Sequence, residues 1–85
     1  MIIPDVNLLI YAYNLDAPAH EQAESWWTEL MNGNRDVGLP WAVSLGFIRL
    51  MTNGTVLVQP LSASEAVLHV KSWFERSQVF ALHPG

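Results

Sequence analysis

The sequence has no cysteine, only four basic residues and no long uninterrupted apolar run. Without cysteine it can form neither a disulfide framework nor a Cys-based zinc site. Four basic against eight acidic residues give a net charge of −4, which argues against broad electrostatic binding of nucleic acid. No run reaches the roughly 18–20 apolar residues of a membrane-spanning helix, and no basic segment precedes the first apolar residues as in a signal peptide. We therefore expect a cytoplasmic protein with no membrane partner.

The chain is short but rich in apolar residues, with 85 residues, 51% of them hydrophobic, and four tryptophans. A chain of this size buries only about 60–65% of the surface that its unfolded state exposes, so its core is small. The apolar content exceeds what such a core needs, which predicts either a homo-oligomer or a part of a larger fold. The turn signal at Pro84 and Gly85, directly after an apolar segment, favours the larger fold.

The first thirteen residues hold the most informative pattern. A short apolar run from Met1 to Ile3 is ended by Pro4, and Asp5 follows at once. This pattern predicts a buried strand and then a helix, with Asp5 at the carboxyl edge of the sheet, where open α/β sheets bind ligands. Asp5 is also typical of a helix N-cap, in which the carboxylate accepts a backbone N–H. Because one oxygen can cap while the other binds a cation, both interpretations stay open.

The rest of the chain alternates helices with short strands. Apolar residues at helical spacing predict helices over 19–31, 41–51 and 63–74. The signature Ser62-Ala63-Ser64-Glu65 predicts a capping box at the start of the last of these helices. Strands are expected at 37–39 and 78–82, and an extended connection or short edge strand at 55–58. This order predicts an α/β fold with a short parallel sheet flanked by helices.

Some side chains in these helices have both a structural and a functional interpretation. Trp26 and Trp27 fall on the apolar stripe of their helix, so we expect them to pack in the core rather than to stack on bases. His20 is expected to be a surface histidine. Arg49 is the only charged residue of its helix, and it is either a surface side chain or a contact to phosphate or carboxylate.

The opening Ile-Ile-Pro-Asp-Val-Asn-Leu-Leu-Ile-Tyr-Ala resembles that of PIN-domain ribonucleases, above all the VapC-type toxins of bacterial type II toxin–antitoxin systems. The downstream residues that resemble one subset of these toxins are His20, Ala23, Trp26 and Trp27, followed by Gly46-Phe47-Ile48-Arg49. The resemblance runs along essentially the whole chain. It implies a single PIN-like domain of which residues 1–85 are the amino-terminal part, truncated before the last strands.

The resemblance also implies an activity, that of a metal-dependent endoribonuclease toxin that hydrolyses RNA phosphodiester bonds and is neutralised by a cognate antitoxin. It implies that Asp5 is a catalytic residue and a ligand of Mg²⁺ or Mn²⁺. The family usually places a second acid on the helix that begins here at Pro40. No carboxylate lies between Trp41 and Asn53, and Gly46 or a neighbour takes the expected place.

The other candidate acids do not fill this gap. Asp16 and Asp36 lie in turn contexts, where Asp commonly bonds the local backbone. With Asp5 as the one matching carboxylate, we expect weak metal binding, because Mg²⁺ gives up its water reluctantly. The alternative is therefore a truncated, catalytically inactive module that binds an antitoxin through the apolar groove of its first helices.

Overall fold

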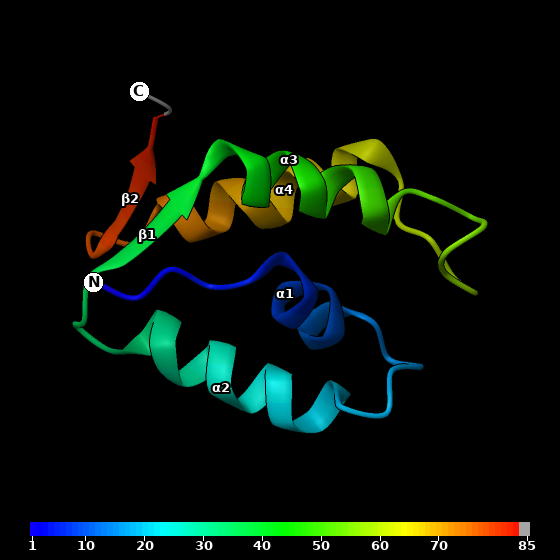
Figure 1. The fold of residues 1–85 in the computed structure, drawn as a ribbon, viewed down its shortest axis with the longest axis horizontal. Coiled ribbons are helices and arrows are strands. Elements are labelled where there is room, and N and C mark those ends of the chain that lie inside the picture. The colour runs from blue at the N-terminus through cyan, green and yellow to red at the C-terminus, as the bar shows by residue number, and fades with distance from the viewer. Residues whose placement is uncertain (84–85) are drawn as a thin grey trace.

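The computed structural model describes residues 1–83 and shows four helices and two strands in them (Figure 1). In chain order these are α1 Val6–Tyr13, α2 His20–Asn32, β1 Val37–Pro40, α3 Trp41–Met51, α4 Ala63–Phe74 and β2 Val79–Leu82. The prediction of an α/β fold with a short parallel sheet flanked by helices is confirmed. None of the helices in residues 1–83 is long and apolar enough to cross a bilayer. The turn signal at Pro84 and Gly85 lies outside the described residues.

The sheet is small and entirely parallel. β1 pairs with β2, with Val37 opposite Val79. On the other side of β1, Ile2 forms a parallel bridge with Val37. The backbone N–H of Ile2 donates to the carbonyl of Asp36, and the N–H of Gly38 donates to the carbonyl of Ile2, both at 2.8 Å. β1 therefore lies between the amino-terminal segment and β2.

The helices form two packed pairs that extend from the sheet. α1 packs on α2, α3 packs on α4, and α1 also contacts α3 and so joins the pairs. In Figure 1 the strands lie at one end, with α3 and α4 above the amino-terminal segment and α2 below it.

The prediction of a buried strand from Met1 to Ile3 is wrong. Only Ile2 makes a bridge, and Met1 and Ile3 are 69% and 56% exposed. Successive side chains of an extended segment point to opposite faces of a sheet. Ile2 therefore points to the face that the helices cover, whereas Met1 and Ile3 point to the other face.

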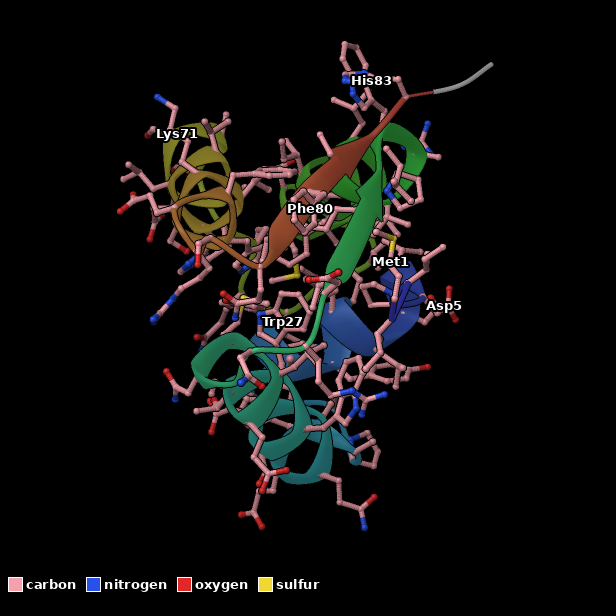
Figure 2. All side chains as sticks on the ribbon, turned by 90° about the vertical axis from the view of Figure 1, so that its left-hand side faces the viewer. Met1, Asp5, Trp27, Lys71, Phe80 and His83 are labelled. Atoms are coloured by element: carbon pink, nitrogen blue, oxygen red, sulfur yellow. The ribbon has the colours of Figure 1, made fainter. Side chains whose placement is uncertain are left out.

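Helices cover only one face of the sheet. Val37 and Leu39 of β1 are fully buried on the covered face, while Phe80 of β2 is 45% exposed on the other. Met1 and Phe80 both lie on the side of the sheet that faces the viewer in Figure 2. A Cβ on Gly38 would lie 2.6 Å from the Sδ of Met1, so glycine at this position lets the Met1 side chain lie across β1.

An aromatic cluster joins the two helix pairs in the core. The rings of Phe47 and Trp73 meet edge to face at 4.7 Å between centroids, and those of Trp27 and Trp73 do so at 5.3 Å. The indole N–H of Trp73 donates to the hydroxyl of Tyr13 at 2.8 Å. Trp27 is 4% exposed, so the prediction that it packs in the core is confirmed.

α4 begins with the capping box that the sequence predicts. The backbone N–H of Ser62 donates to the Glu65 carboxylate at 3.1 Å, and the N–H of Glu65 donates to the Ser62 hydroxyl at 3.2 Å. The hydrogen bonds from the Ser62 backbone, and then from its side chain, lower the pKa of the Glu65 carboxyl below its ordinary value.

The prediction of an extended segment at 55–58 is wrong, because Asn53 folds it into a turn. The carboxamide oxygen of Asn53 accepts the backbone N–H of Thr55 at 2.9 Å and its hydroxyl at 2.7 Å. The backbone N–H of Leu57 donates a hydrogen bond to the Asn53 carbonyl at 3.1 Å. Asn commonly closes turns in this way.

Candidate functional site

Asp5 lies where the amino-terminal segment leaves the sheet and α1 begins. It is the N-cap residue of α1, and its main-chain carbonyl accepts the N–H groups of Leu8 and Leu9 at 3.1 and 3.4 Å. Its side chain makes no capping hydrogen bond. The N-cap position is therefore confirmed, and the expected capping by the carboxylate is not seen.

The Asp5 carboxylate is consequently available to a ligand. Asp5 is exposed, and Figure 2 shows it at the edge of the molecule. Asp5 comes three residues after Ile2, which forms a parallel bridge with Val37 of β1. The Asp5 carboxylate therefore lies beyond the carboxyl end of this bridged segment. Ligands of open α/β sheets bind at this edge. The position agrees with the sequence prediction, while the metal-binding and catalytic roles remain hypotheses.

α3 approaches the first turn of α1, directly after Asp5, and carries no carboxylate. A Cβ built on Gly46 would lie 3.4 Å from the Cγ2 of Val6, the residue directly after Asp5. Gly46 therefore faces the first turn of α1. This is the helix on which the resemblance to PIN domains places a second acid, and in this chain the contact is apolar.

The described residues do not complete a metal site around Asp5. Within residues 1–83 no group of three His, Cys, Asp or Glu side chains is close enough to hold a metal ion. The backbone N–H of Asp16 donates to the Asn14 carboxamide at 3.1 Å, which confirms that Asp16 lies in a local turn. The carbonyl of Asp36 accepts the N–H of Ile2, so that backbone is part of the sheet. One carboxylate can supply one ligand, and a Mg²⁺ site needs further oxygen donors.

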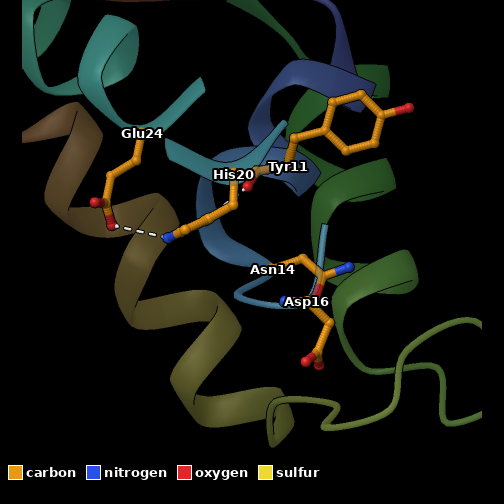
Figure 3. Close-up of polar contacts among 5 residues, drawn as sticks. All are labelled: Tyr11, Asn14, Asp16, His20 and Glu24. Carbon is orange, nitrogen blue, oxygen red and sulfur yellow. Dashed lines mark hydrogen bonds and ion pairs between the residues drawn. The ribbon is translucent and has the colours of Figure 1, made fainter. Parts of the chain in front are cut away.

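His20 is not the surface residue that the sequence predicts, because its side chain is only 13% exposed. Its Nδ1 lies 2.9 Å from the carbonyl oxygen of Tyr11, and its Nε2 lies 3.4 Å from the carboxylate of Glu24 (Figure 3). A carbonyl only accepts hydrogen bonds, so Nδ1 carries the proton of this contact. His20 thus ties the first turn of α2 to the last turn of α1.

The chain is similar to curated ribonucleases along its whole length. It is 39% identical over 85 residues to Ribonuclease VapC33 of Mycobacterium tuberculosis, covering 100% of this chain and 59% of that protein. It is 34% identical over 85 residues to VapC ribonuclease Mb2897 of Mycobacterium bovis, covering 58% of it. Ribonuclease VapC37 of Mycobacterium tuberculosis is 30% identical over 84 residues, 99% of this chain and 58% of that protein. No protein-family profile matches the chain.

Proposed function

We propose that this chain belongs to the VapC ribonuclease family and serves as an endoribonuclease toxin of that type, because all 85 residues align with VapC ribonucleases. The similarity to proteins that are themselves ribonucleases carries this proposal. The chain spans about 59% of the length of its relatives, so the reaction of the whole protein, its RNA substrate and its partners are part of the proposal.

We assign Asp5 as the catalytic carboxylate and as a ligand of Mg²⁺ or Mn²⁺. Its exposure, its place beyond the carboxyl end of a sheet segment and its lack of a side-chain capping bond support this assignment. In the described residues, Asp5 is not part of any group of three potential metal ligands. The chain alone should therefore bind the ion weakly.

A chimeric protein tests the ribonuclease proposal. The segment of Ribonuclease VapC33 that aligns with this chain is replaced by residues 1–85, and cleavage of RNA is followed in the presence of Mn²⁺. We expect the chimera to cleave RNA and EDTA to stop this cleavage. A chimera with a folded circular dichroism spectrum and a single unfolding transition, yet no cleavage, would overturn the proposal.

A titration tests the metal assignment separately. Mn²⁺ binding to the 85-residue chain is measured by calorimetry for the parent, for Asp5→Asn and for the matched control Asp16→Asn. We expect Asp5→Asn alone to weaken binding, with the helix content unchanged, because the Asp5 side chain makes no capping hydrogen bond that the change could remove. Equal binding by the parent and Asp5→Asn would remove Asp5 from the metal site.

The proposed partners are RNA and a cognate antitoxin, with the protein acting in the cytoplasm. The exposed side chains of α1 offer the antitoxin an apolar surface, since Leu8 and Tyr11 are each 40% exposed and Leu15, in the following turn, is 75% exposed. Co-expression and co-purification of the chain with a candidate antitoxin tests this contact. Leu8→Glu should abolish co-purification, and an unchanged yield would place the antitoxin elsewhere.

A further inference from the structure

His20 and Glu24 lie one turn apart on α2, the helix that packs on α1. The Nε2 of His20 is 3.4 Å from the Oε2 of Glu24, and Figure 3 shows the two side chains pointing toward one another. The His20 side chain is 13% exposed and the Glu24 side chain 59%, so the pair opens to solvent on the side of Glu24. We refer to these two residues as the His20–Glu24 pair.

The carbonyl of Tyr11 determines which ring nitrogen of His20 carries a proton. It lies 2.9 Å from Nδ1 and can only accept, so in a neutral imidazole Nε2 is left with a lone pair and no proton. The Glu24 carboxylate is also an acceptor only. Two acceptor atoms at 3.4 Å repel one another unless a positive charge lies between them, either a second proton or a metal ion. Histidines that bind metals commonly donate their other ring N–H to a backbone carbonyl in this way.

The distance between the two acceptor atoms favours a metal ion of one kind. A charge-assisted N–H···O bond spans about 2.7–2.9 Å, so 3.4 Å is long for a shared proton. Neighbouring donor atoms of a tetrahedral Zn²⁺ ion, with bonds of about 2.0–2.2 Å, lie roughly 3.4 Å apart. Those of an octahedral Mg²⁺ ion, with bonds of about 2.0–2.1 Å, lie roughly 2.9 Å apart. Zinc also binds imidazole nitrogen together with carboxylate oxygen, whereas magnesium selects oxygen.

A cavity beside the His20–Glu24 pair has room for the remaining ligands of such an ion. Its volume is about 340 Å³, and both residues of the pair line it, together with Leu15 and Thr28. One water takes about 30 Å³ of liquid volume, so two waters fit beside the ion. The pair belongs to no group of three potential metal ligands in residues 1–83. Water is therefore the ligand that completes the tetrahedron.

We propose that the His20–Glu24 pair binds Zn²⁺ through Nε2 and Oε2, with water in the other two positions. This site is separate from Asp5, which lies before α1, whereas the pair lies on α2. Since Nδ1 of His20 holds the Tyr11 carbonyl, the bound ion stabilises the attachment of α2 to the last turn of α1. With two protein ligands in place of four, the site binds zinc more weakly than a structural zinc site does.

Calorimetric titration of the 85-residue chain with Zn²⁺, from micromolar to submillimolar concentration, tests the proposal. Glu24→Gln removes one ligand, and Glu21→Gln is the matched control, because it removes the same charge from an exposed position on the same helix. Both side chains are exposed, so neither change disturbs the core. We expect the Kd to rise at least about tenfold in Glu24→Gln, since loss of an outer-shell partner alone costs that much, and to stay unchanged in Glu21→Gln.

Thermal melts give a second readout for the other ligand. An ion that binds only the folded state raises the Tm, so Zn²⁺ should raise the Tm of the parent chain. The same addition should leave the Tm of His20→Gln unchanged and raise that of His69→Gln, a control that removes a histidine from α4. An equal rise in His20→Gln and the parent would contradict the proposed ligand.

Three results of the titration would overturn the proposal. A parent chain that binds no Zn²⁺ at submillimolar concentration would show that the pair is an ion pair between imidazolium and carboxylate. Equal losses in Glu24→Gln and Glu21→Gln would assign the binding to surface charge. A loss in Asp5→Asn but not in Glu24→Gln would place the ion at Asp5. The readout involves no RNA, so its failure is distinct from failure of the proposed ribonuclease function.

Discussion

Replacing Tyr13 by Phe removes one hydroxyl from the contact between α1 and α4. That hydroxyl accepts the indole N–H of Trp73 at 2.8 Å, and Trp73 is only 2% exposed. The variant therefore leaves a buried donor without an acceptor, which costs about 1–3 kcal/mol. The edge-to-face contact between the Tyr13 and Phe47 rings, at 5.3 Å, is kept. We expect the free energy of unfolding to fall by about 1.5 kcal/mol and the Tm by roughly 6–12 °C.

Urea unfolding followed by tryptophan fluorescence measures this loss. The m-value should not change, because the variant exposes no additional surface on unfolding. Tyr11→Phe is the matched control, since Tyr11 is 40% exposed and its contact with His20 is made by its backbone carbonyl, which the change leaves in place. Its stability should stay within about 0.5 kcal/mol of the parent. If Tyr13→Phe also stays within this range, the bond between Tyr13 and Trp73 does not help to hold α1 on α4.

Three further predictions concern the helix cap and the candidate site. The hydrogen bonds to Ser62 lower the pKa of the Glu65 carboxyl from its ordinary value of 4.5. The ionised carboxylate therefore stabilises the fold at pH values above 4.5, and this stabilisation is lost as the pH falls through the lower pKa of the folded state. The difference in Tm between the parent and Glu65→Gln should therefore become smaller when thermal melts are repeated from neutral pH to below 4.5. A difference in Tm that does not change with pH would contradict this prediction. The 85-residue chain alone should show no metal-dependent RNA cleavage above background, and cleavage that both EDTA and Asp5→Ala abolish would prove this wrong. Gly46→Glu places a carboxylate beside the first turn of α1 and should raise the Mn²⁺ affinity roughly tenfold in calorimetry. An equal gain in an Asp5→Asn background would show that the two carboxylates do not share an ion.

The sequence predicts the helices well because local signals define them. The apolar stripe of α2 and the capping box formed by Ser62 and Glu65 depend on residues three or four positions apart. The features that it misses depend on distant contacts or on a single turn. His20 contacts the backbone carbonyl of Tyr11, nine positions earlier, which no periodic pattern reveals. The segment after Asn53 is apolar enough for a strand, but the Asn53 side chain turns it instead.

The position of the candidate site and its lack of a second acid are predictable from the sequence, whereas its contacts are not. An apolar run, a proline and then Asp5 are enough to place the carboxylate at the sheet edge. Whether the Asp5 carboxylate accepts a capping hydrogen bond depends on its side-chain conformation, which the sequence does not determine. The sequence shows that 41–53 holds no carboxylate, but the contact of Gly46 with Val6 joins residues forty positions apart, so only the fold shows that Gly46 faces the first turn of α1.

The central claim, that this chain provides the catalytic Asp5 of a VapC-type ribonuclease, is tested most directly by the RNA cleavage rate of the VapC33 chimera and its Asp5→Ala and Asp16→Ala variants. Asp16 is the control because its backbone lies in a local turn, and it belongs to no group of potential ligands in residues 1–83. We predict a loss of at least about a hundredfold in Asp5→Ala, because the reacting groups are then no longer positioned, and a change within a few-fold in Asp16→Ala. An Asp5→Ala chimera that is folded and cleaves RNA at the parent rate would contradict the claim.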